Sequence, residues 1–185
     1  MFLNINANAN SPREVMSSTD VHRAIVRISH EIVERNHGVE GLAIVGLQRG
    51  GTWIAEAITS QINLIEITVK VPCGALDVSL HRDDIGLRPV SLGAITKIPF
   101  DLTGATVVLV DDVLFTGRTV RAAMEGLNNF GRPRAVQLAV LVDRGHRELP
   151  IRPDFVGKNL PTQQDDDVTA TSDGVFITAM SGAKQ

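Results

Sequence analysis

Residues 107–119 read Val-Val-Leu-Val-Asp-Asp-Val-Leu-Phe-Thr-Gly-Arg-Thr, and they predict the fold more specifically than any other part of the sequence. The apolar, β-branched run from Val107 to Val110 is typical of a strand that is buried on both faces. Asp111 and Asp112 follow where that strand is expected to end. The small and hydroxylic residues Thr116 to Thr119 come next and lead into a predicted helix.

A loop between a strand and a helix exposes the free N–H groups of the helix N-terminus, which can bind a phosphate. The helix is expected at Val120 to Phe130, and Gly117 would let the preceding backbone turn tightly. The paired carboxylates would repel a bare polyphosphate, but they suit sugar hydroxyls or a metal ion held between them and phosphates. A ribose 5-phosphate would satisfy both the carboxylates and the phosphate-binding turn. The run resembles the phosphoribosyl pyrophosphate signature of type I phosphoribosyltransferases. The alternative is an ordinary strand-turn-helix with a capping Asp and Thr, which is a less specific pattern.

Length and composition predict a globular protein of one domain. The chain has 185 residues, 43% of them hydrophobic, and a net charge of −3 that by itself gives no indication of nucleic-acid binding. The one cysteine, Cys73, cannot form an internal disulfide, so we expect a cytoplasmic protein with Cys73 as a small apolar residue. The sequence shows neither a membrane span nor a signal-peptide pattern. Residues 1–16 are expected to form a disordered arm, and residues 17–185 the domain.

Hydrophobic periodicity predicts strands that alternate with helices. The first helix is expected from its N-cap Thr19 to its C′ residue Gly38. The further elements are expected as a strand at 41–47, a helix at 52–62, a strand at 64–71, a short sheet extension at 77–80, a strand at 135–142 and a hairpin about Ser172-Asp173-Gly174. Residues 81–99 and 143–160 show no regular pattern. This order indicates a parallel α/β sheet that binds ligands at the carboxyl ends of its strands.

Two further loops are expected at that edge. Gln48-Arg49-Gly50-Gly51 follows the first strand, and its guanidinium and amides would bind a leaving pyrophosphate; an exposed turn arginine is the alternative. Segment 81–98 is long for a loop, and we interpret it as a lid that brings Arg82 onto the pyrophosphate and excludes water. A solvated surface loop is the alternative for most of its charges. No Ser/His/Asp or Cys/His set indicates a covalent step, so positioning and leaving-group charge would drive catalysis.

Four segments together resemble one family more closely. They are Asp-Val-Ser-Leu-His-Arg-Asp-Asp at 77–84, Val-Asp-Asp-Val-Leu-Phe-Thr-Gly-Arg-Thr at 110–119, Leu-Val-Asp-Arg-Gly-His-Arg-Glu-Leu-Pro-Ile-Arg at 141–152 and Val-Gly-Lys-Asn-Leu-Pro-Thr at 156–162. From about Val21 onward the chain resembles the bacterial pyrimidine regulatory (PyrR) family. The resemblance implies the type I phosphoribosyltransferase fold, in which helices flank a parallel sheet core that carries a small hood and a flexible loop.

The same resemblance implies two activities. One converts uracil and phosphoribosyl pyrophosphate (PRPP) to UMP and pyrophosphate, with Mg²⁺ held mainly through PRPP. The other regulates pyrimidine biosynthetic genes through UMP-dependent binding to leader RNA. The family also implies a homo-oligomer, either a dimer or a tetramer.

Site residues are carried over position by position. The expected catalytic residues are Arg49, Arg82, Asp111 and Asp112. The expected substrate-binding residues are Gln48, Arg49, Gly50, Arg82, Asp111, Asp112, Val113, Leu114, Phe115, Thr116, Gly117, Arg118 and Thr119, with Asp143, Arg144, Gly145 and His146 of the hood near uracil. No dedicated metal ligands are expected. Gln48 replaces the usual Thr, while His81 and Phe115 each replace a Tyr; we expect these changes to leave catalysis intact, whereas Val26 replaces a Thr that bears on RNA contact.

The expected RNA-binding residues are Arg23, Arg27, His30, Arg147 and Lys158. The first three share one face of the first helix at i, i+4 and i+7. Residues 131–158 hold six basic and three acidic residues, whereas the tail from Asn159 holds four Asp and one Lys, so charge is segregated along the sequence. Plain solvation of a charged helix and loop is the alternative. We expect single-stranded loop RNA as the ligand.

Two other functions stay open from the sequence. One is a phosphoribosyltransferase that does not bind RNA. The other is a purine phosphoribosyltransferase, which is less favoured because purine sites usually stack an aromatic residue on the base and this hood has few aromatics. A purely structural protein would not need Arg49, the paired acids and a lid.

Overall fold

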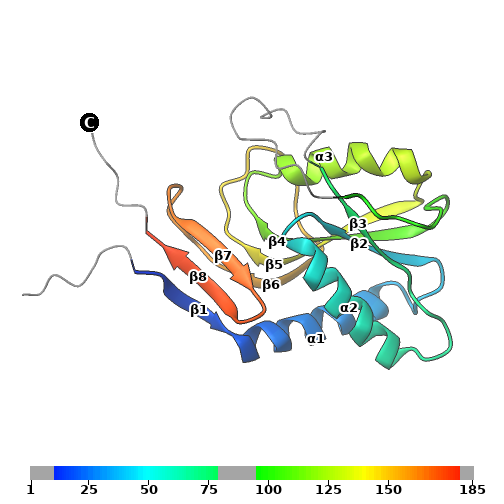
Figure 1. The fold of residues 1–185 in the computed structure, drawn as a ribbon, viewed down its shortest axis with the longest axis horizontal. Helices are drawn as coiled ribbons and strands as arrows, with labels where there is room; N and C mark the ends of the chain where they lie inside the picture. Colours follow the sequence, from blue (N-terminus) through cyan, green and yellow to red (C-terminus); the bar gives the residue numbers. More distant parts are fainter. Residues whose placement is uncertain (1–10, 79–94, 180–185) are drawn as a thin grey trace, which may run out of the picture.

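A parallel five-stranded sheet forms the centre of the protein (Figure 1), and the computed structural model describes residues 11–78 and 95–179. In spatial order the strands are β3 (Cys73–Leu76), β2 (Leu42–Leu47), β4 (Thr106–Leu114), β5 (Ala135–Asp143) and β6 (Phe155–Asn159), and all of their pairings are parallel. The chain leaves β2 toward β3 on one side and returns to β4 on the other. The direction of winding therefore reverses between β2 and β4, and open α/β sheets bind their ligands at such a point.

Helices cover both faces of this sheet, which confirms the predicted fold class (Figure 1). α1 (Ser18–Arg35) and α2 (Gly51–Ile65) lie on one face, and α3 (Arg118–Leu127), which continues into the 3-10 turn η3 (Asn128–Phe130), lies on the other. Strand β4 shows the reason, because Val108 and Val110 pack toward α1 and α2 while Val107 and Leu109 pack toward α3. Successive strand side chains point to opposite faces, so an uninterrupted apolar run needs cover on both.

A small antiparallel sheet lies beside the first, with β8 (Gly174–Thr178) between β1 (Arg13–Ser17) and β7 (Asp167–Thr171). The β7–β8 hairpin confirms the turn predicted about Ser172-Asp173-Gly174. Strand β1 pairs with β8, so residues 13–16 are part of a sheet and the expectation that they belong to a disordered arm is wrong. The partner strand comes from the other end of the chain, and local sequence carries no signal for such a pairing.

Both ends of α1 lie next to the residues predicted for them. Ser17 is the N-cap instead of Thr19: its Oγ accepts a hydrogen bond from the Asp20 N–H at 3.2 Å, and Asp20 Oδ2 accepts one from the Ser17 N–H at 3.0 Å. The Ser17 hydroxyl also donates to Asp20 Oδ2 at 2.8 Å, and this bond, together with the one from the Ser17 N–H, lowers the pKa of the Asp20 carboxyl from its ordinary value. At the other end His37, with φ of 55°, takes the left-handed position expected for Gly38.

Four predictions about the strands need correction. α2 continues to Ile65, so the strand expected at 64–71 is wrong; β3 is shorter and begins only at Cys73. Ile67 and Val69 alternate as in a strand, but their side chains are exposed. Strand β6 forms inside a segment that was expected to be irregular, and β4 extends beyond Val110 to Leu114. The predicted extension at 77–80 forms no strand at its described residues 77 and 78, and residues 79 and 80 lie outside the described parts.

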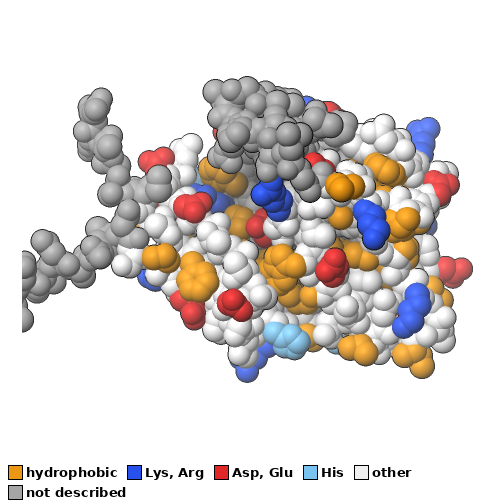
Figure 2. Space-filling view, in the orientation of Figure 1, with side chains coloured by type: hydrophobic (Ala, Val, Ile, Leu, Met, Phe, Trp, Pro, Cys, Tyr) orange, Lys and Arg blue, Asp and Glu red, His pale blue; other side chains and the backbone are white. Residues whose placement is uncertain are grey.

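The surface carries both signs of charge. On the face shown in Figure 2, acidic, basic and hydrophobic side chains are interspersed, in keeping with the small net charge. In the described parts of the chain, no helix combines the length and apolar character that a membrane span requires.

Candidate active site

The loop after β2 lies directly against the carboxylates of β4. A Cβ atom added to Gly50 would lie 1.9 Å from Oδ2 of Asp112, and one added to Gly51 would lie 2.1 Å from the carbonyl oxygen of Val110. Only glycine, which has no side chain, fits at these two positions. The 48–51 loop contains Arg49 and a cis peptide bond between Gln48 and Arg49, and it lies in contact with the end of β4 at the reversal point of the sheet.

Asp111 and Asp112 lie within β4 rather than after it, which corrects the predicted end of the strand. Asp111 is 7% exposed, and its Oδ1 accepts a hydrogen bond from the Asp112 N–H at 3.1 Å. Asp112 accepts one from the Val113 N–H at 2.8 Å. These bonds to the following backbone fix the direction of both carboxylates. Asp111 pairs with Val140 of β5 in the sheet, so the acids stand on a rigid support at its carboxyl edge.

The Thr116–Thr119 turn closes at the N-terminus of α3, as the sequence predicts. Gly117 is the N-cap with φ of 93°, a left-handed conformation that favours glycine. The Arg118 N–H donates to the Thr116 hydroxyl at 3.3 Å, and the guanidinium of Arg118 forms an ion pair of 2.6 Å with Glu148. We define residues 115–119 as the phosphate loop.

The hood contains a cavity of about 410 Å³ at the ends of two adjacent strands. One wall is Asp143, Arg144, Gly145 and His146 after β5, and the other is Asn159, Leu160, Pro161 and Thr162 after β6. Thr162 joins the walls, because its hydroxyl accepts from Arg144 Nε at 3.1 Å and its carbonyl accepts from His146 Nε2 at 2.7 Å. The second wall is absent from the predicted site residues. The segment Val-Gly-Lys-Asn-Leu-Pro-Thr, which supports the family resemblance, was the signal that could have identified it.

Phe115 connects the phosphate loop to this cavity. The guanidinium of Arg144 lies 4.3 Å from the centre of its ring, and the His146 ring meets it edge-on with centroids 5.9 Å apart. Burial lowers the pKa of Arg144 from its ordinary value, and the carboxylates of Asp166 and Asp167 act in the opposite direction. Phe115 has no ring hydroxyl, and its ring serves as an apolar contact for Arg144.

The predicted lid falls largely on residues 79–94, which lie outside the described parts of the chain. The assignment of Arg82 to the pyrophosphate thus stays a prediction. The described end of the segment is attached at two points: Gln48 Nε2 donates to the carbonyl of Ile95 at 3.2 Å, and the backbones of Lys97 and Ala75 bond to each other. Gln48 therefore joins the loop that contains Arg49 to the start of this described piece.

Three of the five residues predicted to bind RNA come together. Arg23 and Arg27 of α1 and Lys158 of β6 line a groove of about 340 Å³, which we name the α1–β6 groove; its other lining residues are Met16, Asp20, Ala24 and Gly157. His30 is exposed on α1 but does not line the groove. Arg147 lies in the hood, where its guanidinium donates to residues of the hood and of the phosphate loop.

Comparisons with known proteins agree with this geometry. The family model for the phosphoribosyl transferase domain matches residues 15–172. A protein of Roseiflexus sp. strain RS-1, named bifunctional protein PyrR, is 54% identical over 181 residues, which are 92% of this chain and 98% of that protein. A bifunctional protein PyrR of Brevibacillus brevis is 58% identical over 151 residues, 80% of this chain and 83% of that protein. The chain belongs to the PyrR family.

Membership of the PyrR family confirms the fold, the enzyme activity and the role in pyrimidine regulation that the sequence resemblance implied. The chain is a uracil phosphoribosyltransferase and a regulator of pyrimidine biosynthesis. Solved structures confirm the fold: a hypoxanthine phosphoribosyltransferase of Staphylococcus aureus, 15% identical, superposes with a TM-score of 0.63 over 88% of this chain and 85% of its own. One from Trypanosoma cruzi, 18% identical, gives 0.64 over 83% and 80%. At this identity the likeness concerns the fold alone and does not support the purine alternative.

Proposed function

We propose that this chain forms UMP at the carboxyl ends of β2 and β4 and binds pyrimidine-operon leader RNA along the α1–β6 groove. The observation that carries the catalytic half is the contact of Gly50 with Asp112. It places the loop suited to pyrophosphate against the acids suited to ribose, at the point where the sheet reverses its winding.

Each part of PRPP has a matching group in this arrangement. Asp111 and Asp112 accept hydrogen bonds from the ribose hydroxyls, and the N–H groups of the phosphate loop bind the 5-phosphate at the α3 N-terminus. Arg49 and the amides of its loop bind the leaving pyrophosphate and the charge that develops on it. The bond from C1 of the ribose to pyrophosphate breaks, with its electron pair leaving on pyrophosphate, as the bond from C1 to the uracil nitrogen forms and the proton on that nitrogen passes to solvent. The protein groups around PRPP and uracil contribute to catalysis mainly by holding the two reactants in position.

Magnesium fits this site as a partner of the substrate. Among the residues that the structure describes, no group of three or more His, Cys, Asp or Glu could hold a metal ion. These residues therefore do not by themselves supply a full set of metal ligands. Mg²⁺ commonly keeps several waters and binds substrate phosphates with one or two carboxylates. Asp111 and Asp112 are the residues that would contact it, and the ion would neutralise charge on the pyrophosphate.

The α1–β6 groove supports the RNA-binding half of the proposal. Three basic side chains line it against one acidic residue, Asp20, so it has a local positive charge in a chain with a small negative total. Arg27 donates to the carbonyls of Val156 and Gly157 at 3.0 and 2.8 Å, and Lys158 donates to that of Val15 at 2.8 Å. These bonds hold α1, β1 and β6 together as the walls of the groove.

Strand β6 supplies a physical reason for dependence on UMP. Lys158 lines the α1–β6 groove, and its neighbour Asn159 lines the hood cavity in which uracil is expected. Displacement of β6 by a nucleotide in the cavity would reach the groove through adjacent residues of one strand. A homo-oligomer, which the family implies, would bring a second groove into the same assembly.

A salt titration of leader-RNA binding tests this proposal. With UMP present, Arg23→Ala, Arg27→Ala and Lys158→Ala should each weaken binding and reduce the salt dependence by about one unit per lost phosphate contact. Arg23 is the least coupled to folding, because Arg27 and Lys158 also donate to backbone carbonyls. Arg121→Ala is the matched control: it removes a charge from α3, on the opposite face of the sheet, and should change neither the affinity nor the slope.

The outcomes separate the alternatives. UMP formation should persist in all three groove variants. If the wild-type protein formed UMP but did not bind leader RNA at any UMP concentration, the chain would be a phosphoribosyltransferase without this regulatory contact. Use of hypoxanthine or guanine with uracil inert would identify a purine enzyme instead.

A further inference from the structure

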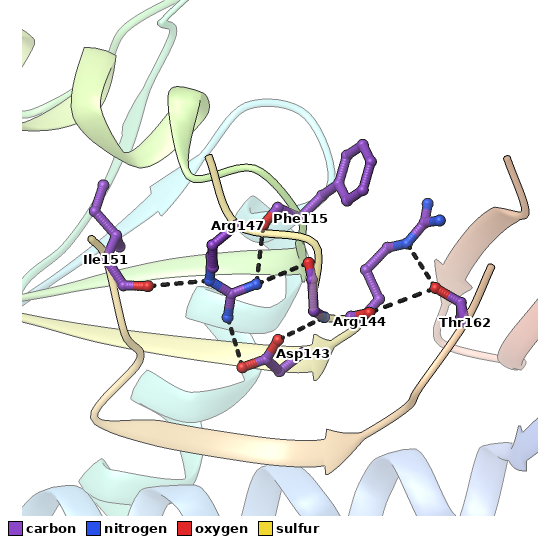
Figure 3. Close-up of polar contacts among 7 residues, drawn as sticks. Phe115, Asp143, Arg144, Arg147, Ile151 and Thr162 are labelled. Atoms are coloured by element: carbon purple, nitrogen blue, oxygen red, sulfur yellow. Dashed lines mark hydrogen bonds and ion pairs between the residues drawn. The ribbon is translucent and has the colours of Figure 1, made fainter. Parts of the chain in front are cut away.

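Arg147 joins the two halves of the active site (Figure 3). Its Nη1 donates to the carbonyl oxygens of Phe115 at 2.9 Å and Gly145 at 3.0 Å. Its Nε donates to the carbonyl of Ile151 at 3.0 Å, and its Nη2 donates to Oδ2 of Asp143 at 2.6 Å. One guanidinium thus holds the first residue of the phosphate loop, two residues of the hood wall and the segment that leads to β6.

The geometry of this contact requires a guanidinium. Its planar fork directs several N–H groups along fixed directions, whereas the ammonium of lysine is a compact charge on a flexible stem. The side chains of Arg147 and Asp143 are only 21% and 17% exposed, so water competes weakly for these bonds. Asp143 is itself fixed, because its Oδ1 accepts a hydrogen bond from the Gly145 N–H at 3.0 Å.

Each half of the site also has bonds of its own. Within the hood, Thr162 joins the two walls of the cavity through Arg144 and His146. Between the halves, the N–H groups of Glu148 and Leu149 donate to the carbonyl of Thr116 at 3.1 and 3.2 Å, and these main-chain bonds lie on the phosphate-loop side, away from the Phe115, Gly145 and Asp143 groups that Arg147 binds. Replacement of Arg147 would therefore loosen the distance between the halves more than it disturbs either half.

We propose that Arg147 is a positioning residue, which sets the phosphate loop and the hood at the separation that brings the ribose and uracil into reaction. The inference rests on the uracil phosphoribosyltransferase activity of the chain. The family resemblance groups Arg147 with the RNA-binding residues, but its contacts predict that its loss acts on the rate of UMP formation. The resulting signature is a fall in kcat with little change in KM, since ground-state binding to each half is retained while near-attack geometry is lost.

The test compares Arg147→Lys and Arg147→Gln with the wild-type protein, which must form UMP in the same assay. The measurements are kcat, KM for uracil and for PRPP, the melting temperature and the number of UMP molecules bound per chain. We expect kcat to fall about 10- to 100-fold in both variants. Each KM should stay within about threefold of wild type, and the UMP stoichiometry should be unchanged. Arg35→Gln is the matched control, because Arg35 also pairs with an aspartate, Asp154, at 2.8 Å but lies at the end of α1.

Three results would overturn the inference. Wild-type kcat in Arg147→Lys would show that charge alone is needed. A UMP stoichiometry that falls in parallel with kcat would show that Arg147 only maintains the folded state. Unchanged kcat in both variants, with leader-RNA binding lost, would assign Arg147 to RNA recognition.

Discussion

Replacing Gly50 with alanine should reduce UMP formation by displacing the Asp112 carboxylate. The new Cβ would lie 1.9 Å from Oδ2 and 2.1 Å from Cγ of Asp112, so the loop or the carboxylate must move by roughly 1.5–2 Å to reach van der Waals contact. Misplacement of a catalytic group by only about 1 Å already costs about 100-fold in rate, which is equivalent to about 2.7 kcal/mol of transition-state stabilisation. The backbone of Gly50 has φ of −69° and ψ of −32°, which alanine adopts without strain. The loss should therefore concern catalysis more than folding.

Steady-state kinetics of UMP formation and thermal unfolding together check this prediction. Gly41→Ala is the control: Gly41 has φ of 68° but open space around its Cβ position, so alanine there should cost about 1–2 kcal/mol of stability without touching the site. It should retain wild-type kcat/KM. The mechanism itself is checked in an Asp112→Gly background, where there is no carboxylate to displace and Gly50→Ala should change kcat/KM by less than about threefold.

Two results would refute the reasoning. The first is a Gly50→Ala protein with wild-type kcat/KM. The second is a full 100-fold loss from Gly50→Ala in the Asp112→Gly background, which would place the effect elsewhere in the 48–51 loop.

Three further predictions concern single side chains. Asp111→Asn should lower kcat/KM for PRPP by about 10- to 100-fold, through loss of a charge-assisted hydrogen bond to a ribose hydroxyl, with the melting temperature nearly unchanged; a wild-type rate would remove Asp111 from the ribose site. Asp20→Ala should lower the melting temperature at pH 7. Because the folded-state pKa of Asp20 is depressed, its stabilisation is present above the unfolded pKa and lost as pH falls through the folded pKa, so the difference from wild type should shrink across that range and vanish below the folded pKa. Partial burial raises the pKa of the Cys73 thiol, so its alkylation at pH 8 should be slower in the native protein than in denaturant, and equal rates would contradict the partly buried position.

Local sequence was sufficient for the parts of the site that depend on neighbouring residues. The burial of Val107 to Val110 on alternate faces of the sheet follows from the period of a strand, and the turn at Gly117 follows from a conformation that glycine adopts readily. Gln48 to Gly51 lie at the same edge of the sheet as the end of β4, because the loops that follow the strands of a parallel sheet meet at one edge. These features are set within a few residues, so a pattern of a few residues predicts them.

The remaining features depend on partners that are distant in the sequence. Strand β1 exists because β8, about 160 residues away, offers its edge, and β6 is stabilised by pairing with β5 in a segment without its own periodicity. By contrast, the equally regular Ile67 and Val69 found no partner strand among the described residues and remain exposed. Strand formation requires a neighbour for its backbone hydrogen bonds, and alternation alone does not supply one.

The sequence by itself determined the fold class and the family, and it predicted the groups for ribose and phosphate, because each is written in contiguous residues. Only the tertiary structure decided which groups the basic residues predicted to bind RNA contact. Arg27 and Lys158 meet across α1 and β6 in one groove, whereas Arg147 turns inward to the carbonyl of Phe115, 32 residues earlier. The charge and spacing of an arginine are visible in a sequence, but the acceptors that its guanidinium reaches depend on which loops the folded sheet brings together.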